Sequence, residues 1–424
     1  MTDTNRAIWA DRLDKAVIFS GAFVPAGIVV GNAGFEAAVA LAGLCWIVRS
    51  VLAGENPLPR LLRHPVLLPW LAWYGSILIS LLWNGPGDKG WAHDVVLIRH
   101  LLFCAALIDT SRRREVARPL LMGLAAGLLW AALNTALAHV FGHDLMGKDL
   151  ERYANKLKEA ERIASFAAYA APFYLAWGLL DKTLTSRNRG LIFGLALLAA
   201  GLMVLFRIRT AMLGAGAGLL LALAYLTTRY ISTKTAVILF LMLGFAGGLG
   251  VKYLPRPGGN LDSVYDRINI WKVAWHMFQE NPVVGVSVSA WRQVYATTAA
   301  SGAVAPYVSP DGRVVRSPDA THCHSLFFQV LSSTGILGSL VFVWLFFSIV
   351  RRVSGGLSGW RYGLLTWPAV FIMIGLTGWN IFGAQYLPIF AFWVALAALP
   401  VEGVNPAGGG SLQPHSGLDS ATRA

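Results

Sequence analysis

The chain has 424 residues, of which 56% are hydrophobic and only 13% are charged, and its mean hydropathy is +0.56. A soluble domain carries about 25% charged residues, so this composition excludes an ordinary soluble globular protein. The formal net charge is +13 at neutral pH, and its meaning depends on the side of a membrane at which the basic residues lie.

Apolar stretches recur along the whole length, and each is long enough to cross roughly 30 Å of hydrocarbon. The sequence therefore predicts an all-α polytopic membrane protein with about twelve transmembrane helices. The expected spans are residues 16–34, 35–53, 65–83, 93–110, 117–141, 163–181, 190–206, 210–228, 234–251, 324–350, 361–378 and 381–400.

Lysine and arginine in the connecting segments set the expected orientation. They gather on the side of the N-terminus, as in the connector that holds Arg112, Arg113 and Arg114. By the positive-inside rule this side is the cytoplasm, and both termini are expected there. We expect four parts along the chain, which are spans one to nine over 1–251, a large loop domain over 252–323, spans ten to twelve over 324–400, and a Gly/Ser/Pro-rich disordered tail over 401–424.

A pair of arginines lies between the spans expected over 190–206 and 210–228. Arg207 and Arg209 flank Ile208 on the non-cytoplasmic side, where short loops usually carry few positive charges. Two guanidinium groups can bind a phosphate headgroup bidentately, but the same side chains can also extend to ordinary lipid phosphates. The sequence leaves both interpretations open.

The large loop contains one predicted amphipathic helix, from Asp262 to Glu280. Its apolar positions recur at three- and four-residue spacing, and Asn281-Pro282 ends the pattern. The stripe consists of Val264, Ile268, Trp271, Trp275 and Phe278. Arg267 lies beside this aromatic stripe. Such a stripe more often packs within a domain than binds sugars.

His322 and His324 lie two residues apart where the chain enters the span expected from residue 324. An HxH pair can bind a metal, but Asp319 and Cys323 are the only other ligand types nearby and no second cluster accompanies them, so we expect no metal site. His324 is a candidate general base, because an imidazole has an unperturbed pKa of about 6.5 and a helix N-terminus disfavours its protonation. A structural role at the membrane interface is the alternative.

Arg99 and His100 interrupt the span expected over 93–110. An arginine inside a membrane costs about 2.5–3.5 kcal/mol on insertion scales, so it should face the bundle or a polar cavity. Either a structural partner or a ligand phosphate would satisfy Arg99, which we keep as an accessory candidate.

Three segments between residues 205 and 345 carry motifs. RTAMLGAGAGLLLA begins a helix with Arg209 before small residues. DRINIWKVAWHMFQENPVVGVS follows the pattern R-x-x-x-W-x-x-A…P-x-x-G, with matches at Arg267, Trp271, Ala274, Pro282 and Gly285. HSLFFQVLSSTGILGSL is a His…G-x-x-G segment, with His324, Gly335 and Gly338 in place. In this order, and with one large loop before the tenth span, they resemble the O-antigen ligase and polymerase family of bacterial inner membranes.

The resemblance implies a metal-independent glycosyltransferase of the GT-C type without a cofactor. Its donor would be a glycan on undecaprenyl pyrophosphate and its acceptor lipid A–core oligosaccharide, at the periplasmic face of the bacterial inner membrane. It implies His324 as the catalytic base, with Arg209 and Arg267 at the pyrophosphate and Arg207 beside them. His322, Arg99 and Trp271 are accessory candidates. Membrane lipids are further expected partners, and no nucleic acid is expected.

Three serines depart from the family pattern and leave substrate selectivity open. Ser287 stands where a second glycine is frequent, Ser325 where asparagine is frequent, and Ser333 where an acidic residue is frequent.

The ligase, which transfers O-antigen en bloc, is the preferred reading of this resemblance, and three alternatives remain. An O-antigen polymerase would use a second undecaprenyl-linked repeat as acceptor. A protein O-oligosaccharyltransferase would use Ser or Thr and is expected to carry a further carboxyl-side domain. A transporter or flippase for an anionic lipid-linked substrate would need more polar residues within the spans than Arg99 and His100.

Overall fold

The computed structural model describes residues 2–143, 157–228, 262–310, 312–378, 381–383 and 386–400, and its regular structure there is almost entirely helical. The first part of the chain forms α1 (Asp3–Val30), α2 (Asn32–Leu52), α3 (Leu58–Leu62), α4 (Leu67–Asn84), a 3₁₀ turn (Gly87–Lys89), α5 (Trp91–Val95), α6 (Ile98–Thr110), α7 (Ala117–Phe141), α9 (Leu157–Leu180), α10 (Ser186–Phe206) and α11 (Arg209–Thr228). The second part forms α13 (Asp262–Glu280), α14 (Trp291–Ala300), β1 (Tyr307–Val308), β2 (Val314–Val315), α15 (Leu326–Ser354), α16 (Arg361–Leu364), α17 (Trp367–Thr377) and α18 (Leu387–Ala398).

Eight helical segments among the described residues are long and apolar enough to cross a membrane. Two shorter apolar helices, 361–376 and 387–398, correspond to the last two expected spans. The first expected span forms part of α1, whose 28 residues extend into a charged N-terminal segment, and the ninth, 234–251, lies outside the described residues. The chain is therefore a multi-pass membrane protein in which the predicted helices recur in the predicted order.

Small residues let the helices of the bundle approach closely. A Cβ on Gly123 of α7 would lie 2.0 Å from the Ala22 carbonyl oxygen of α1, and one on Gly127 would lie 2.7 Å from the Pro25 backbone. Such contacts are typical of membrane helices, where close packing rather than water exclusion favours association.

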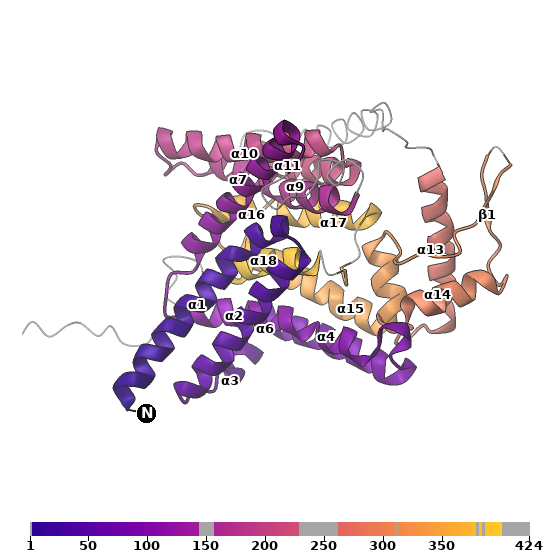
Figure 1. The fold of residues 1–424 in the computed structure, drawn as a ribbon, viewed down its shortest axis with the longest axis horizontal. Coiled ribbons are helices and arrows are strands. Elements are labelled where there is room, and N and C mark those ends of the chain that lie inside the picture. The colour runs from indigo at the N-terminus through magenta and orange to yellow at the C-terminus, as the bar shows by residue number, and fades with distance from the viewer. Residues whose placement is uncertain are drawn as a thin grey trace, which may run out of the picture.

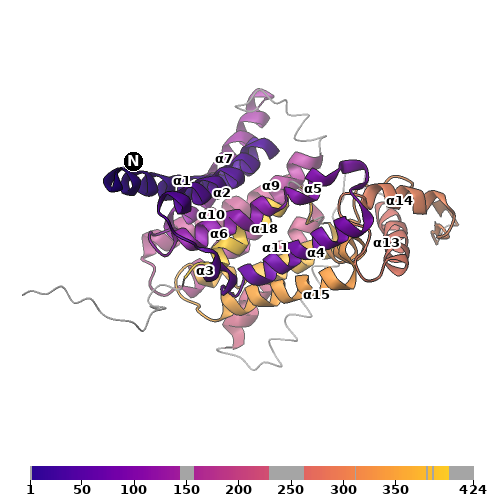
Figure 2. The same cartoon turned by 90° about the horizontal axis from the view of Figure 1, so that it is seen from below.

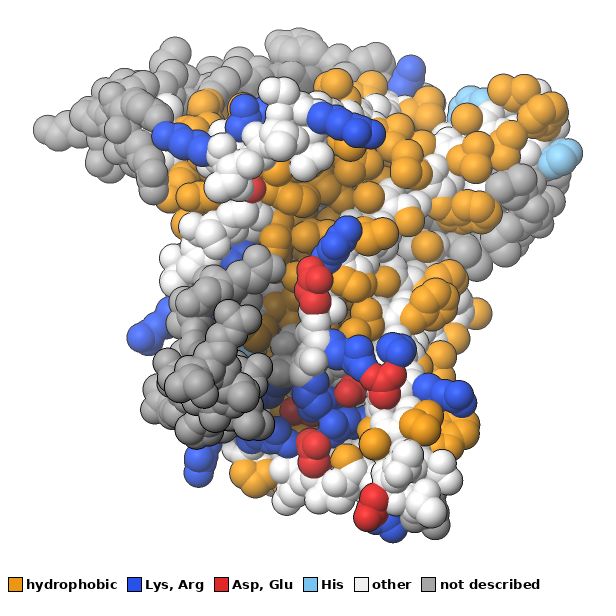
Figure 3. All heavy atoms as spheres, turned by 90° about the vertical axis from the view of Figure 1, so that its left-hand side faces the viewer, with side chains coloured by type: hydrophobic (Ala, Val, Ile, Leu, Met, Phe, Trp, Pro, Cys, Tyr) orange, Lys and Arg blue, Asp and Glu red, His pale blue; other side chains and the backbone are white. Residues whose placement is uncertain are grey.

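Ion pairs join α1, α2 and α6 at the end of the bundle that carries the N-terminus, and Figure 3 shows the basic and acidic side chains gathered there. Arg113 donates to both carboxylate oxygens of Asp14 at 3.0 and 3.1 Å and to Asp109 at 3.0 Å. Arg49 pairs with Glu55 at 2.7 Å. These buried and half-buried charges compensate one another, which is the condition for keeping them away from water.

The described part of the large loop is a small domain of α13, α14 and the β1–β2 hairpin, here called the loop domain (residues 262–323). Both ribbon views place α13 and α14 at the end of the bundle away from the N-terminus (Figures 1 and 2). The helix predicted from Asp262 to Glu280 is confirmed over these residues, and it ends at the predicted residue, Glu280. Its buried face, however, is formed by Ile270, Val273, Ala274 and Met277, whereas Trp275 of the predicted stripe is 44% exposed.

A kink in α15 joins the loop domain to the bundle. Gly335 has φ +64° and ψ −165°, which interrupts the helix. In an unbroken helix the N–H groups of Ile336 and Leu337 would bond to the carbonyls of Ser332 and Ser333. Here they donate instead to Pro282 and Val283, at 2.8 and 3.2 Å.

The two carbonyls released by the kink are satisfied by the same loop. Ser332 accepts from the N–H of Val286 at 2.9 Å, and Ser333 accepts from the N–H of Ser287 at 3.0 Å. Four backbone groups of α15 thus exchange helical partners for partners in the segment 282–287. This exchange avoids unsatisfied backbone groups, which cost several kcal/mol each inside a membrane.

We expect Gly335→Ala to destabilise the protein strongly. Its backbone conformation is open only to glycine, a strain of about 1–3 kcal/mol for other residues, and the new Cβ would lie 2.3 Å from the Val283 carbonyl oxygen. Thermal unfolding in detergent measures the effect. Gly201→Ala in α10 is the matched control, because a Cβ there meets nothing within 4 Å. Equal Tm values for the two variants would contradict the proposed role of the kink.

Candidate active site

His324 lies in a constrained turn between the loop domain and α15. Its φ is +50°, a left-handed conformation that non-glycine residues adopt rarely, and Ser325 follows it as the N-cap residue of α15. Strained backbone of this kind persists only where its surroundings hold it, and it gathers at functional sites.

The surroundings that hold this turn are polar contacts on both sides of Cys323. Its carbonyl accepts a hydrogen bond from Nε1 of Trp271 at 2.9 Å, and its N–H donates to Oε1 of Gln329 at 2.9 Å. The Trp271 ring also stacks on Phe328, with centroids 5.6 Å apart. Helices α13 and α15 thus fix the backbone next to His324, and Trp271 acts there by positioning.

The environment of His324 keeps its imidazole neutral. The pKa of His324 is lowered to about 4, first by burial and then by the positive charge of Arg267, while the carboxylate of Asp266 acts in the opposite direction. Near neutral pH the ring is therefore deprotonated and able to accept a proton. Arg267 and Trp271 are four residues apart on α13, so they share one face of the helix that packs beside His324.

His322 lies against His324, with ring centroids 4.0 Å apart, and its Nδ1 is 2.9 Å from Oγ1 of Thr321. Asp319 is engaged by Arg292 in a bidentate pair at 3.0 and 3.1 Å. Within the described ranges, no group of three or more His, Cys, Asp or Glu side chains is placed to hold a metal ion.

Arg207 and Arg209 form the turn between α10 and α11. Arg207 caps α10 in a left-handed conformation with φ +50° and is exposed, whereas Arg209 begins α11 and is half-buried. The last turn of α17 relates this turn to His324. A Cβ on Gly378 would lie 3.3 Å from Thr210, and a Cβ on Gly375 would lie 2.9 Å from Leu326.

Gly375 and Gly378 are three residues apart, about 4.5 Å along a helix axis. Thr210 follows Arg209 directly, and Leu326 is two residues after His324. The segments that carry Arg209 and His324 therefore both pack on the same end of α17, through the side chains of Thr210 and Leu326, although they are 115 residues apart in the chain.

Arg99 has a protein partner. Its Nε donates to Glu36 at 2.5 Å and its Nη1 to the Val96 carbonyl at 2.8 Å, and His100 Nε2 lies 3.7 Å from the same carboxylate. Of the two explanations that the sequence left open for Arg99, the structural partner is the one found, and this pair joins α6 to α2.

Three polar residues that the sequence analysis did not single out hold the segment 282–290. Ser80 donates to the Ser333 carbonyl and accepts from the Ser287 N–H, both at 2.9 Å. Asn84 donates to the Gly285 carbonyl at 2.9 Å, and the fully buried Asp94 accepts from the N–H and hydroxyl of Ser289. The sequence signal that could have identified Asp94 is its position, since it is a carboxylate at the start of an apolar run.

Ser287, which stands where the family often has glycine, keeps a glycine-like backbone conformation. Its φ is +68°, a conformation that favours glycine. The serine offsets this strain with its side chain, since Oγ donates to the Gly85 carbonyl at 3.2 Å and accepts from the Ala290 N–H at 3.2 Å.

Residues 193–343 match the family model described as O-antigen ligase. The match runs from α10 to α15 and includes Arg207, Arg209, Arg267 and His324. The resemblance predicted from the motifs is confirmed. It supports a function of the O-antigen ligase or polymerase type, in which a membrane enzyme transfers a glycan from a lipid carrier to a lipid acceptor. No curated protein matches the chain.

The charges beside His324 predict how its titration responds to substitution. Arg267→Gln removes a cation and should raise the pKa of His324 from about 4 toward its ordinary value, whereas Asp266→Asn should lower it. Diethyl pyrocarbonate reacts with the neutral imidazole, so peptide mass spectrometry across a pH series gives the midpoint at His324. Midpoints that do not move in opposite directions would contradict this electrostatic account.

Proposed function

We propose that this chain, whose residues 193–343 match the family model described as O-antigen ligase, transfers a glycan from undecaprenyl pyrophosphate to lipid A–core oligosaccharide. The reaction takes place at the periplasmic face of the bacterial inner membrane, with the active site around His324 and both termini in the cytoplasm. The observation that carries this proposal is His324 itself, a neutral histidine in a strained turn with an arginine beside it, inside the matched domain.

In the proposed reaction a hydroxyl of the acceptor attacks the anomeric carbon of the donor glycan. The new C–O bond forms as the bond from that carbon to the pyrophosphate oxygen breaks, with inversion at the carbon. The hydroxyl proton passes to the neutral ring of His324, and undecaprenyl pyrophosphate leaves with the bonding electrons.

Arg209 and Arg267 are proposed to hold the pyrophosphate, with Arg207 at the exposed edge of the same turn. Guanidinium groups bind phosphate oxygens bidentately and stabilise the negative charge that grows on the leaving group. In many transferases a divalent cation supplies this stabilisation, and here the arginines are assigned that task. A pyrophosphate whose charge is held leaves readily, so the proposal needs no general acid.

Substitution of the two histidines should separate catalysis from structure. His324→Ala should reduce transfer by about 10²–10⁴-fold, the usual contribution of a general base, whereas His322→Ala should have a mild effect. Purified protein, undecaprenyl-pyrophosphate glycan and lipid A–core are combined with EDTA, and the lipopolysaccharide is resolved on a gel. Equal loss in both variants would instead indicate a shared structural or metal-binding role.

The same assay distinguishes the related activities. Slower-migrating lipopolysaccharide supports the ligase. Longer glycan that remains on undecaprenyl pyrophosphate would make the protein a polymerase, and a change in neither lipid would overturn glycan transfer.

Lysine should not replace the arginines at the proposed pyrophosphate site. Arg209→Lys and Arg267→Lys each keep the charge but lose the planar pair of donors, so both should lower the transfer rate. Arg292→Lys is the matched control, because Arg292 lies in the same domain and pairs with Asp319 on the surface. Wild-type rates in Arg209→Lys would remove that residue from the donor site.

A further inference from the structure

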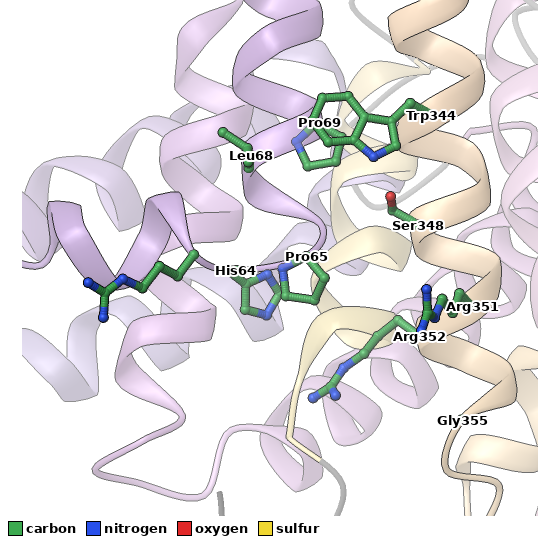
Figure 4. Close-up of a pocket in the computed structure, with 10 residues that line it drawn as sticks. His64, Pro65, Leu68, Pro69, Trp344, Ser348, Arg351, Arg352 and Gly355 are labelled. Carbon is green, nitrogen blue, oxygen red and sulfur yellow. The ribbon is translucent and has the colours of Figure 1, made fainter.

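A cavity of about 570 Å³ opens at the end of the bundle away from His324, between the start of α4 and the end of α15 (Figure 4). It lies on the side of the N-terminus, which we expect to be cytoplasmic. The residues that line it are Arg63, His64, Pro65, Leu68, Pro69, Trp344, Ser348, Arg351, Arg352 and Gly355.

The lining is divided into an apolar half and a cationic half. Leu68, Pro69 and Trp344 form the apolar half, and Arg351 and Arg352 lie about two turns further along α15 (Figure 4). Seven residues separate Trp344 from Arg351, a rise of about 10 Å along a helix. Trp344 is 47% exposed and Leu68 39%, so the apolar half opens outward at the surface of a membrane-spanning helix.

Among the described residues, the arginines of the cavity lack the carboxylate partners that Arg49, Arg60 and Arg113 have on the same end of the molecule. No acidic residue lines the cavity, and within the ranges that the structure describes no ion pair involves Arg63, Arg351 or Arg352. Three arginines from segments nearly 290 residues apart thus line one cavity, with no counter-ion among those residues.

His64 leaves this excess of positive charge unchanged, and Arg352 has a donor without a partner in the described part of the protein. Burial, and then the charge of Arg352, lower the pKa of His64 to about 4, so this ring stays neutral and adds no charge near pH 7. Arg352 donates to the Leu399 carbonyl through Nη2 at 3.1 Å, while its buried Nε has no hydrogen-bond partner in the protein. A ligand with anionic oxygens would balance the positive charge of the cavity.

We infer that this cavity binds the phosphate of an anionic phospholipid from the membrane leaflet on the side of the N-terminus. The headgroup phosphate contacts Arg63, Arg351 and Arg352, and an acyl chain follows the apolar half along Leu68 and Trp344. Arginine binds phosphate oxygens bidentately, and basic residues at a membrane surface attract anionic lipids. An inorganic phosphate shares the headgroup chemistry but cannot use the apolar half.

Because of where the cavity lies, a bound lipid would affect the stability of the helix bundle. The lipid would bridge the ends of α4 and α15, the two helices whose opposite ends hold the segment 282–287 through Ser80, Asn84 and Ser333. Bound lipid should therefore stabilise the bundle that carries the site, independently of which reaction the site performs.

The test compares lipid binding in wild type and in Arg63→Gln/Arg351→Gln. Delipidated protein in detergent is titrated with phosphatidylglycerol, and bound lipid and Tm are followed by native mass spectrometry and thermal unfolding. Each arginine near an anionic lipid contributes about fivefold in affinity, so the double variant should bind roughly 25-fold more weakly. Arg6→Gln/Arg187→Gln removes the same charge from exposed positions outside the cavity and should bind as wild type does.

Three further measurements separate binding of an anionic lipid from binding of any lipid, binding of free phosphate and loss of folding. Phosphatidylcholine, a zwitterionic lipid, should raise Tm less than phosphatidylglycerol, and inorganic phosphate should not reproduce the rise. Arg63→Gln alone, outside any long helix, is the second variant if the double variant unfolds. Equal phosphatidylglycerol affinity in cavity and control variants, or an equal rise in Tm with inorganic phosphate, would overturn the proposal.

Discussion

The exchange of backbone hydrogen bonds at Gly335 holds the loop domain against the helix bundle. A membrane helix cannot bend sharply without releasing N–H and C=O groups, and in hydrocarbon those groups find no water. The segment 282–287 supplies two acceptors and two donors to the break in α15. The loop domain is therefore joined to the bundle through main-chain groups, which side-chain variation cannot remove. Ser80 and Asn84 of α4 bind the same segment, so three parts of the chain are fixed relative to one another.

This junction explains how His324 can hold a strained conformation at the edge of a membrane. The short part of α15 before the kink takes its direction from the exchange at Gly335, and His324 lies just before its first residue. On the other side, α13 holds the carbonyl of Cys323 through Trp271. A turn held from both ends keeps the imidazole in one position. If His324 is the proposed general base, this matters for catalysis, because a misplacement of about 1 Å can cost 10²-fold in rate.

Local patterns predicted much of this architecture, and long-range contacts account for the rest. The helical periodicity of α13 and its end before Asn281-Pro282 depend on residues close together in the chain, so they were predictable. Which face of α13 is buried depends on α14 and α15, and the exposure of Trp275 could not be read from spacing. The kink at Gly335 lies within an apolar run that suits a continuous span. Its partner segment is about fifty residues away, and so only the fold brings the two together. The Arg99–Glu36 pair, 63 residues apart, was hidden for the same reason.

If the proposed chemistry holds, the charges beside His324 link the strength of the base to the presence of the donor. With the site empty, burial and the cation at Arg267 depress the pKa of His324 to about 4, which makes the ring a weak base. A general base works best when its pKa lies near the operating pH. A pyrophosphate bound at Arg267 brings negative charge that cancels the effect of this guanidinium and adds an attraction for the imidazolium, so both changes raise the pKa of His324. The arginine that holds the leaving group would then also keep the histidine inactive until the donor arrives. Proton transfer from an acceptor hydroxyl would become favourable only when the bond to be broken is already in place.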